Sequence, residues 1–161
     1  MPFSEQQLAD IPRTLSAPRF ATYLQAAGNS PSDALALYQW NLEISAAFME
    51  LIHVAEVSTR NGAEEAIVAV HGPTWPWNQG FITALPQYGN IYSPRTDLIK
   101  VAAKEPTTGK VVAELKFAFW QNMFTKRHDN QIWRKHLFHN FPNTGTVQIN
   151  EARGKIYANI E

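Results

Sequence analysis

Three histidines fall close together near the end of the chain, at positions 128, 136 and 139. Imidazole transfers protons near neutral pH and is a common metal ligand. On a helix, His136 and His139 would share a side, but His128 would lie two turns away, and no carboxylate joins them at the spacing of a metal site. We therefore interpret them as surface histidines, and the sequence predicts neither a metal nor a cofactor.

The same segment interleaves basic and aromatic side chains. The basic residues are Lys126, Arg127, Arg134, Lys135 and His136, and Trp133 and Phe138 lie among them. Positive charge combined with stacking surfaces is typical of proteins that bind single-stranded RNA. A solvated helix face that backs onto core aromatics produces the same pattern. RNA binding by these five basic residues is therefore one hypothesis, and a purely structural role is the other.

A second line of polar residues lies earlier in the chain. It comprises His53, Glu56, Arg60, Asn61 and Glu64. On a helix His53, Glu56, Arg60 and Glu64 would line one face, with Glu56 and Arg60 in the favourable order for an ion pair. The line is either a solvent-facing stripe with weak ion pairs or the wall of a groove. In a groove, Arg60 should be partly buried and bonded to a carboxylate or a backbone carbonyl.

Helices must position these residues, because the sequence carries almost no strand signal. Residues 30–71 are predicted to form one long helix or two nearly continuous ones, beginning with Ser30 as N-cap, Pro31 as first residue and Asp33 as first-turn acid. Its apolar residues fall on nearly every side: Leu37, Ile44, Phe48, Leu51 and Ala55 form one stripe, and Trp40, Ala47 and Val54 lie beside it. A helix that is apolar almost all round is expected to be buried.

The remaining elements complete an all-α prediction. Capping residues and 3.6-residue periodicity predict helices near residues 16–28, 94–106, 111–124, 129–141 and 146–160. The segment 72–93 is irregular but rich in aromatic residues, so we expect it to pack as a lid and not to form a linker. No repeat or boundary is visible. The prediction is a single helical domain over residues 1–161, with five to seven helices bundled around one long central helix.

Composition limits the function classes. The chain has 161 residues, is 45% hydrophobic and contains no cysteine, which suits a reducing compartment. No apolar run approaches the ~20 residues of a membrane span, and no signal peptide is apparent, so the expected location is cytoplasmic, with no membrane partner. Net charge is zero, but residues 1–80 hold 3 Lys/Arg against 8 Asp/Glu and residues 81–161 hold 11 against 6. Such polarity can steer an anionic partner to the second half.

Several blocks of the sequence, in order, resemble one family. The blocks are Leu15–Arg19, Ala34–Asn41, Glu56–Asn61 and Ala113–Trp120, followed by Trp133 and Phe141. The chain is similar over nearly its whole length to the Abi-like (abortive infection) proteins of bacterial phage defence, which belong to the HEPN superfamily of helical ribonucleases. Ala118 departs from the pattern, because the family usually has Gly there.

The resemblance implies a metal-independent endoribonuclease that acts as a homodimer, with an antitoxin as a further partner. The family's catalytic motif resembles Arg-Asn-Arg-x-Ala-His-His-Glu and follows the segment that corresponds to residues 149–161. The sequence ends before it and keeps helical periodicity up to Ile160. The expectation is therefore a HEPN-like domain lacking its C-terminal helix, inactive as given. It should either self-associate, with Ile156 and Ile160 close to the contact, or be a marginally stable monomer.

No catalytic residue can be carried over from the family. Arg134 and His139 match the loose spacing of the superfamily motif, but they lie in the wrong helix and without the Asn, so we interpret the match as coincidence. The alternative to a ribonuclease scaffold is a non-enzymatic helical module that binds RNA or a protein partner.

Overall fold

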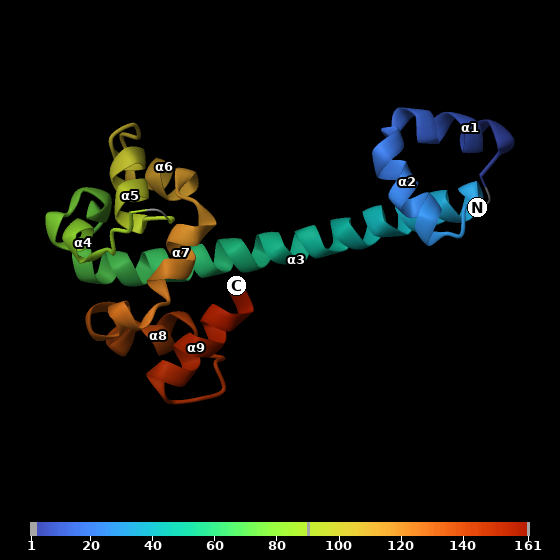
Figure 1. Ribbon diagram of the computed structural model, residues 1–161. Helices are drawn as coiled ribbons and strands as arrows, with labels where there is room; N and C mark the ends of the chain where they lie inside the picture. Colours follow the sequence, from blue (N-terminus) through green and yellow to red (C-terminus); the bar gives the residue numbers. More distant parts are fainter. Residues whose placement is uncertain (1–2, 90, 161) are drawn as a thin grey trace. The chain divides into compact units, whose positions relative to one another are not determined.

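The computed structural model describes residues 3–89 and 91–160, and every regular element in these ranges is helical. The predicted all-α fold is confirmed. The described α-helices are α1 (Glu5–Thr14), α2 (Ala17–Ala26), α3 (Pro31–His71), α4 (Gln79–Ala84), α5 (Pro94–Ala102), α6 (Thr108–Glu114), α7 (Phe117–Met123), α8 (Arg134–Asn140) and α9 (Ile149–Ile160) (Figure 1). They outnumber the predicted five to seven, because α1 and α4 were not predicted and one predicted helix is divided into two.

Contacts between residues group the chain into two compact units, with the boundary inside α3 between His53 and Val54. Each unit has its own cluster of buried apolar side chains. Because the boundary falls within a continuous helix, no linker composition marks it in the sequence.

The first unit contains α1, α2 and the N-terminal part of α3. Its buried core consists of Phe20, Ala34 and Leu35, with apolar side chains of α1 packed against them. α1 begins with a capping box, in which Ser4 and Gln7 each accept the other's backbone N–H. That pair was present in the sequence and could have predicted this helix.

The long helix α3 spans Pro31–His71 without a break, which is the first of the two predicted forms. Burial along its whole length, however, is contradicted. Leu35 is buried near the start and Ile67 near the end, but Leu51, between them, is 67% exposed. More than half of the side chain is also exposed at Trp40, Leu42, Phe48, Met49, Ile52 and Val54.

Aromatic side chains form the centre of the second unit. Six of them are fully buried: Trp75, Phe81, Phe119, Trp120, Phe124 and Trp133. The Trp75 ring centroid lies 5.3 Å from that of Phe81 and 6.0 Å from that of Phe119. The segment 72–93 therefore packs onto the later helices, as expected.

Two predicted helices are interrupted. The one expected over residues 111–124 is divided into α6 and α7, because Leu115 and Lys116 adopt extended backbone conformations. The one expected over residues 129–141 begins with a π-helical turn, Asp129–Trp133, before α8 starts. Just after α8, Phe141 packs so closely on α3 that a Cβ at Gly62 would lie 2.5 Å from the ring Cζ.

Candidate anion-binding pocket

A polar pocket of about 350 Å³ lies in the second unit, between the turn that precedes α8 and the first residues of α9. Its lining consists of Lys126, Asp129, Asn130, Arg134, Gln148, Ile149 and Asn150. All of these except Ile149 are polar or charged. The pocket therefore offers hydrogen-bonding groups and charge from two segments that are separated in the sequence.

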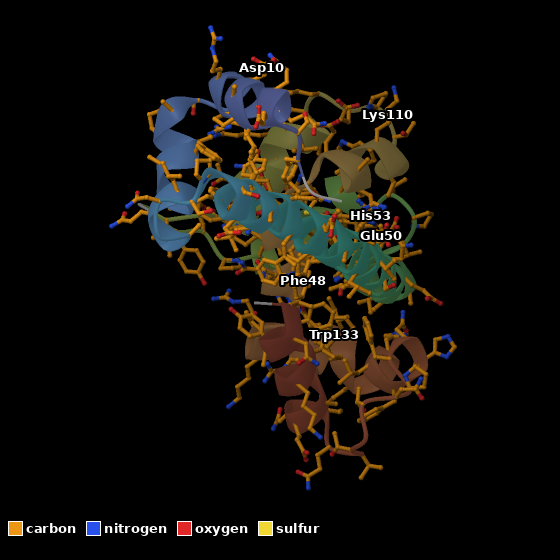
Figure 2. The ribbon with its side chains drawn as sticks, turned by 90° about the vertical axis from the view of Figure 1, so that its right-hand side faces the viewer. Asp10, Phe48, Glu50, His53, Lys110 and Trp133 are labelled. Carbon is orange, nitrogen blue, oxygen red and sulfur yellow. The ribbon has the colours of Figure 1, made fainter. Side chains whose placement is uncertain are left out.

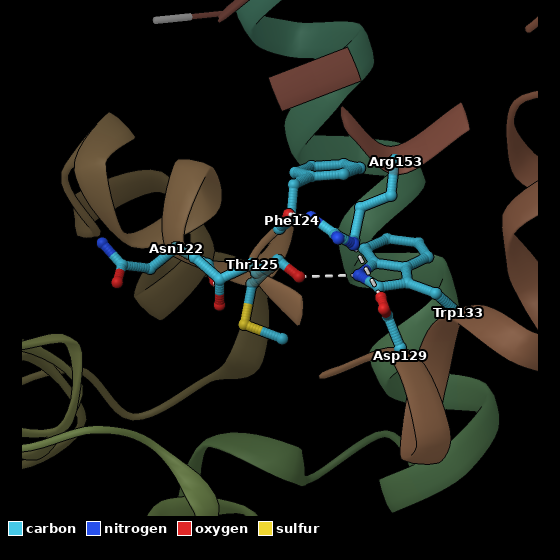
Figure 3. Close-up of polar contacts among 7 residues, drawn as sticks. Asn122, Phe124, Thr125, Asp129, Trp133 and Arg153 are labelled. Atoms are coloured by element: carbon cyan, nitrogen blue, oxygen red, sulfur yellow. Dashed lines mark hydrogen bonds and ion pairs between the residues drawn. The ribbon is translucent and has the colours of Figure 1, made fainter. Parts of the chain in front are cut away.

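One wall is a 3-10 turn, Lys126–His128, followed directly by the π-helical turn. π-helical turns are rare, and buried aromatic packing stabilises this one. Trp133 donates its indole N–H to the Met123 carbonyl at 2.6 Å (Figure 3). Its ring also stacks on Phe124, with centroids 4.7 Å apart. The aromatic residues thus anchor the segment, while Lys126 and Arg134 at its two ends remain exposed.

An ion pair joins this wall to α9. Arg153 Nε lies 2.7 Å from Asp129 Oδ1, and both side chains are largely buried (Figure 3). The Nε–H does not point well at the oxygen, so charge more than hydrogen bonding holds the pair. Arg153 also donates from Nη1 to the Phe124 carbonyl at 2.8 Å. Because Arg153 balances the charge of Asp129, Lys126 and Arg134 make the pocket electropositive.

The opposite wall is the beginning of α9. Thr146 Oγ1 accepts the Gln148 backbone N–H at 3.2 Å and donates to a carboxylate oxygen of Glu151 at 2.9 Å. The first backbone N–H groups of a helix have no acceptor within it, and the helix dipole adds partial positive charge there. Ile149 and Asn150 supply such groups beside the pocket. Both walls therefore favour an anion, and in the described ranges no acidic side chain pairs with Lys126 or Arg134.

The structure brings together two of the five predicted RNA-binding residues. Lys126 and Arg134 line the pocket, whereas the other three are not among its lining residues. Arg127 instead donates to a backbone carbonyl of α4 at 3.4 Å. Lys135 is exposed on α8, and His136 beside it is half-buried. The candidate site is thus smaller than the basic segment in the sequence.

The interpretation of the histidines as surface residues is wrong for His128, which is 1% exposed. Burial, together with the nearby charges of Arg127 and His71, lowers the pKa of His128 to about 4. His139 is exposed, with Nε2 3.7 Å from a carboxylate oxygen of Glu65. Among the described residues, no three His, Asp or Glu side chains are placed to hold a metal ion.

The polar line on α3 does not form a bonded site. His53 and Asn61 are exposed, whereas Glu56, Arg60 and Glu64 are half-buried. Burial raises the pKa of Glu64, and the charge of Arg60 partly offsets this. The expected half-burial of Arg60 is observed, but the expected hydrogen bond is not: its Nε is enclosed without a partner in the described part of the chain. Glu56 and Arg60 do not pair there either.

Five pocket residues were not predicted as functional: Asp129, Ile149 and the three amides Asn130, Gln148 and Asn150. Their amide side chains have no distinctive spacing, so no sequence motif marks them. They meet because of the π-helical turn and the Asp129–Arg153 ion pair, neither of which the sequence predicted. The only available signal was Thr146, which was recognised as the start of the last helix.

No family model, no curated protein and no solved structure matches the chain. The resemblance to the Abi-like family therefore stays a prediction. In the described ranges, none of the helices combines the length and apolar character that crossing a membrane requires.

Proposed function

We propose that the chain binds RNA through its phosphates, at the pocket between the turn before α8 and the start of α9. The observation that carries the proposal is the convergence of Lys126 and Arg134 on one pocket whose other wall is a helix N-terminus. Phosphate oxygens are bound well by such a combination of cationic side chains and backbone N–H groups. Arg134 can also offer two parallel N–H donors to one phosphate.

The proposed activity is binding without cleavage. Cleavage of RNA without a metal requires a base that removes the proton of the 2′-hydroxyl. The pocket lining contains no histidine. His128, the histidine nearest to Lys126 in the sequence, is buried and is not among the lining residues. The pocket thus holds groups that attract a phosphate, while its one carboxylate, Asp129, is held in an ion pair with Arg153 and is not free to accept a proton.

We further propose the biological setting that the family resemblance implies. It is a HEPN-like, Abi-related phage-defence protein in the cytoplasm, which forms homodimers and has an antitoxin partner. The support is the ordered series of sequence blocks together with the all-α fold.

Two neighbouring cations of α8 provide a matched test of RNA binding. Arg134 lines the pocket and Lys135 does not, although both are exposed. Fluorescence anisotropy with labelled single-stranded RNA would measure affinity over a series of salt concentrations. We expect Arg134→Gln to weaken binding by about five- to tenfold. It should also reduce the slope of log K against log salt by about 0.7, the value for one phosphate contact with a single strand.

Lys135→Gln should change the affinity much less, because its charge lies outside the pocket. Equal losses in the two variants would show that binding depends on general positive charge and would contradict the proposed site. A wild-type chain that binds no RNA at low salt would contradict the proposed function itself.

A further inference from the structure

The exposed part of α3 carries apolar residues at heptad spacing. Leu37, Ile44 and Leu51 recur every seven residues, and Trp40, Ala47 and Val54 each follow one of them by three. These six residues, which we call the heptad stripe, occupy the a and d positions of a coiled coil over about two and a half heptads. Such spacing is the pattern by which one helix packs against another along its length.

The heptad stripe is not used by the packing of the first unit. α1 and α2 pack on α3 through Ala34 and Leu35, and Tyr23 packs edge-on against Tyr38. With 3.6 residues per turn, Leu35 lies about 160° around the helix from the line through Leu51. The N-terminal helices therefore cover a different side of α3.

The area of the heptad stripe suits a dimer. Trp40 is 56% and Leu51 67% exposed. A free aromatic side chain offers ~150–250 Å², and aliphatic ones offer less. Leu37 and Ile44 are half-buried and the other four are exposed, so the stripe, with Phe48 at its margin, provides on the order of 600 Å² per copy. A stable interface takes ~800 Å² from each partner, and the residues flanking the stripe can supply the remainder.

We propose that the heptad stripe pairs with the same stripe of a second copy of this chain, as a parallel two-stranded coiled coil. Charge favours the parallel orientation. No Lys or Arg lies between Arg19 and Arg60, and Glu43 and Glu50 flank the stripe at g positions. In an antiparallel pair, Glu43 of one copy would lie near Glu50 of the other, and the two like charges would repel. In a parallel pair, each g position faces an e position of the other copy, so the glutamates lie beside uncharged Phe48 and Ala55.

The side chains of α3 supply a matched pair of variants. Phe48 and Glu50 project from different sides of the helix (Figure 2), and Leu51 and Met49 are likewise about 160° apart. Leu51 lies in the heptad stripe and Met49 outside it, yet they are similarly exposed, at 67% and 63%. Because both side chains are exposed, a charge at either position should change the stability of the single chain little. A difference in association between the two variants therefore shows which side of α3 forms the interface.

Sedimentation equilibrium at about 100 μM, well above a micromolar dissociation constant, would measure the mass. We expect the wild-type chain to have twice the 18.2 kDa of one copy. Leu51→Glu should return it to a single chain mass, while Met49→Glu should leave the dimer intact. Circular dichroism of both variants would check that the helices are retained.

Cysteine crosslinking tests the orientation and stays decisive even if Leu51→Glu loses its structure. The chain has no cysteine, so Leu51→Cys introduces a unique thiol, which a parallel pair places opposite its counterpart. Mild oxidation should then yield a disulfide-linked dimer, and Met49→Cys should yield little. A monomeric wild-type chain would overturn the proposal. This is also the result expected if the second unit of the same chain covers the stripe. Equal dissociation by both glutamate variants, or absence of the Leu51→Cys crosslink, would also overturn it.

Discussion

At the scale of single residues, the burial of His128 should make the free energy of unfolding depend on pH. Its pKa is about 4 in the folded chain, against an ordinary value of 6.5, because burial disfavours the charged form. The unfolded chain therefore binds a proton more readily than the folded one between these values. The free energy of unfolding should be at its full value above pH 6.5 and should decrease as the pH falls towards 4, by on the order of 3 kcal/mol. Urea denaturation between about pH 7.5 and pH 4.5 measures the decrease.

A neutral replacement identifies the residue responsible. His128→Gln should flatten the decrease in the free energy of unfolding, whatever it does to stability at neutral pH. His139→Gln is the matched control, because His139 is exposed beside Glu65, and it should leave the decrease as in the wild-type chain. Burial also lowers the pKa of His71, so a smaller decrease in the same direction should remain in His128→Gln. An unchanged profile in that variant would contradict the assignment.

At the scale of helices, periodicity and packing give different information. The apolar pattern of α3 predicted correctly that the segment is helical throughout, but it could not say what covers each side. Burial depends on which other segments reach the helix, and within the first unit these reach its beginning, from Ala34 to Asn41. Phe48 and Leu51 consequently remain exposed although their spacing is that of a buried helix.

Two helical glycines should respond in opposite ways to the same substitution. Gly62 on α3 faces the Phe141 ring, where an added Cβ would lie 2.5 Å from Cζ, whereas Gly154 on α9 has open space around it. Alanine favours a helix over glycine by ~1 kcal/mol, so Gly154→Ala should raise the free energy of unfolding by up to that amount. Gly62→Ala should lower it by about 1–3 kcal/mol, the usual cost of overpacking. Chemical denaturation of both variants provides the comparison, and stabilisation by Gly62→Ala would show that Phe141 moves aside freely.

At the scale of the whole molecule, the sequence predicted composition-dependent features well and contact-dependent features poorly. Helix class, the limits of α3 and the packing of segment 72–93 follow from capping and periodicity. The pocket depends on an ion pair between Asp129 and Arg153, which are separated by 23 intervening residues and have no recognisable spacing. The burial of His128 likewise depends on contacts, since the sequence around it is basic and polar. Residue types therefore predicted the cations of the site, but not which of them converge.

The last prediction concerns catalysis and rests on how the histidines are distributed. Residues 1–161 contain no copy of the family's Arg-Asn-Arg-x-Ala-His-His-Glu motif. Of the three clustered histidines, His128 is buried with a lowered pKa, and neither His136 nor His139 lines the pocket that would hold a phosphate. An RNA bound at Lys126 and Arg134 would thus have no histidine beside its 2′-hydroxyl, and the one carboxylate of the pocket, Asp129, is paired with Arg153. We expect the purified chain to retain labelled RNA intact, with or without added Mg²⁺, under conditions in which it binds that RNA.

A gel assay of labelled RNA tests this expectation, with His139→Ala as the informative variant. Arg134 and His139 have the spacing of the superfamily motif, and His139 lies on the same helix, 3.7 Å from the Glu65 carboxylate. Cleavage by the wild-type chain that disappears in His139→Ala would show that this spacing is functional and that Glu65 orients the imidazole, which would place the active site on α8. Cleavage that persists in His139→Ala would instead point to a contaminating nuclease, because no other exposed histidine lies at motif spacing from Arg134 in the described ranges.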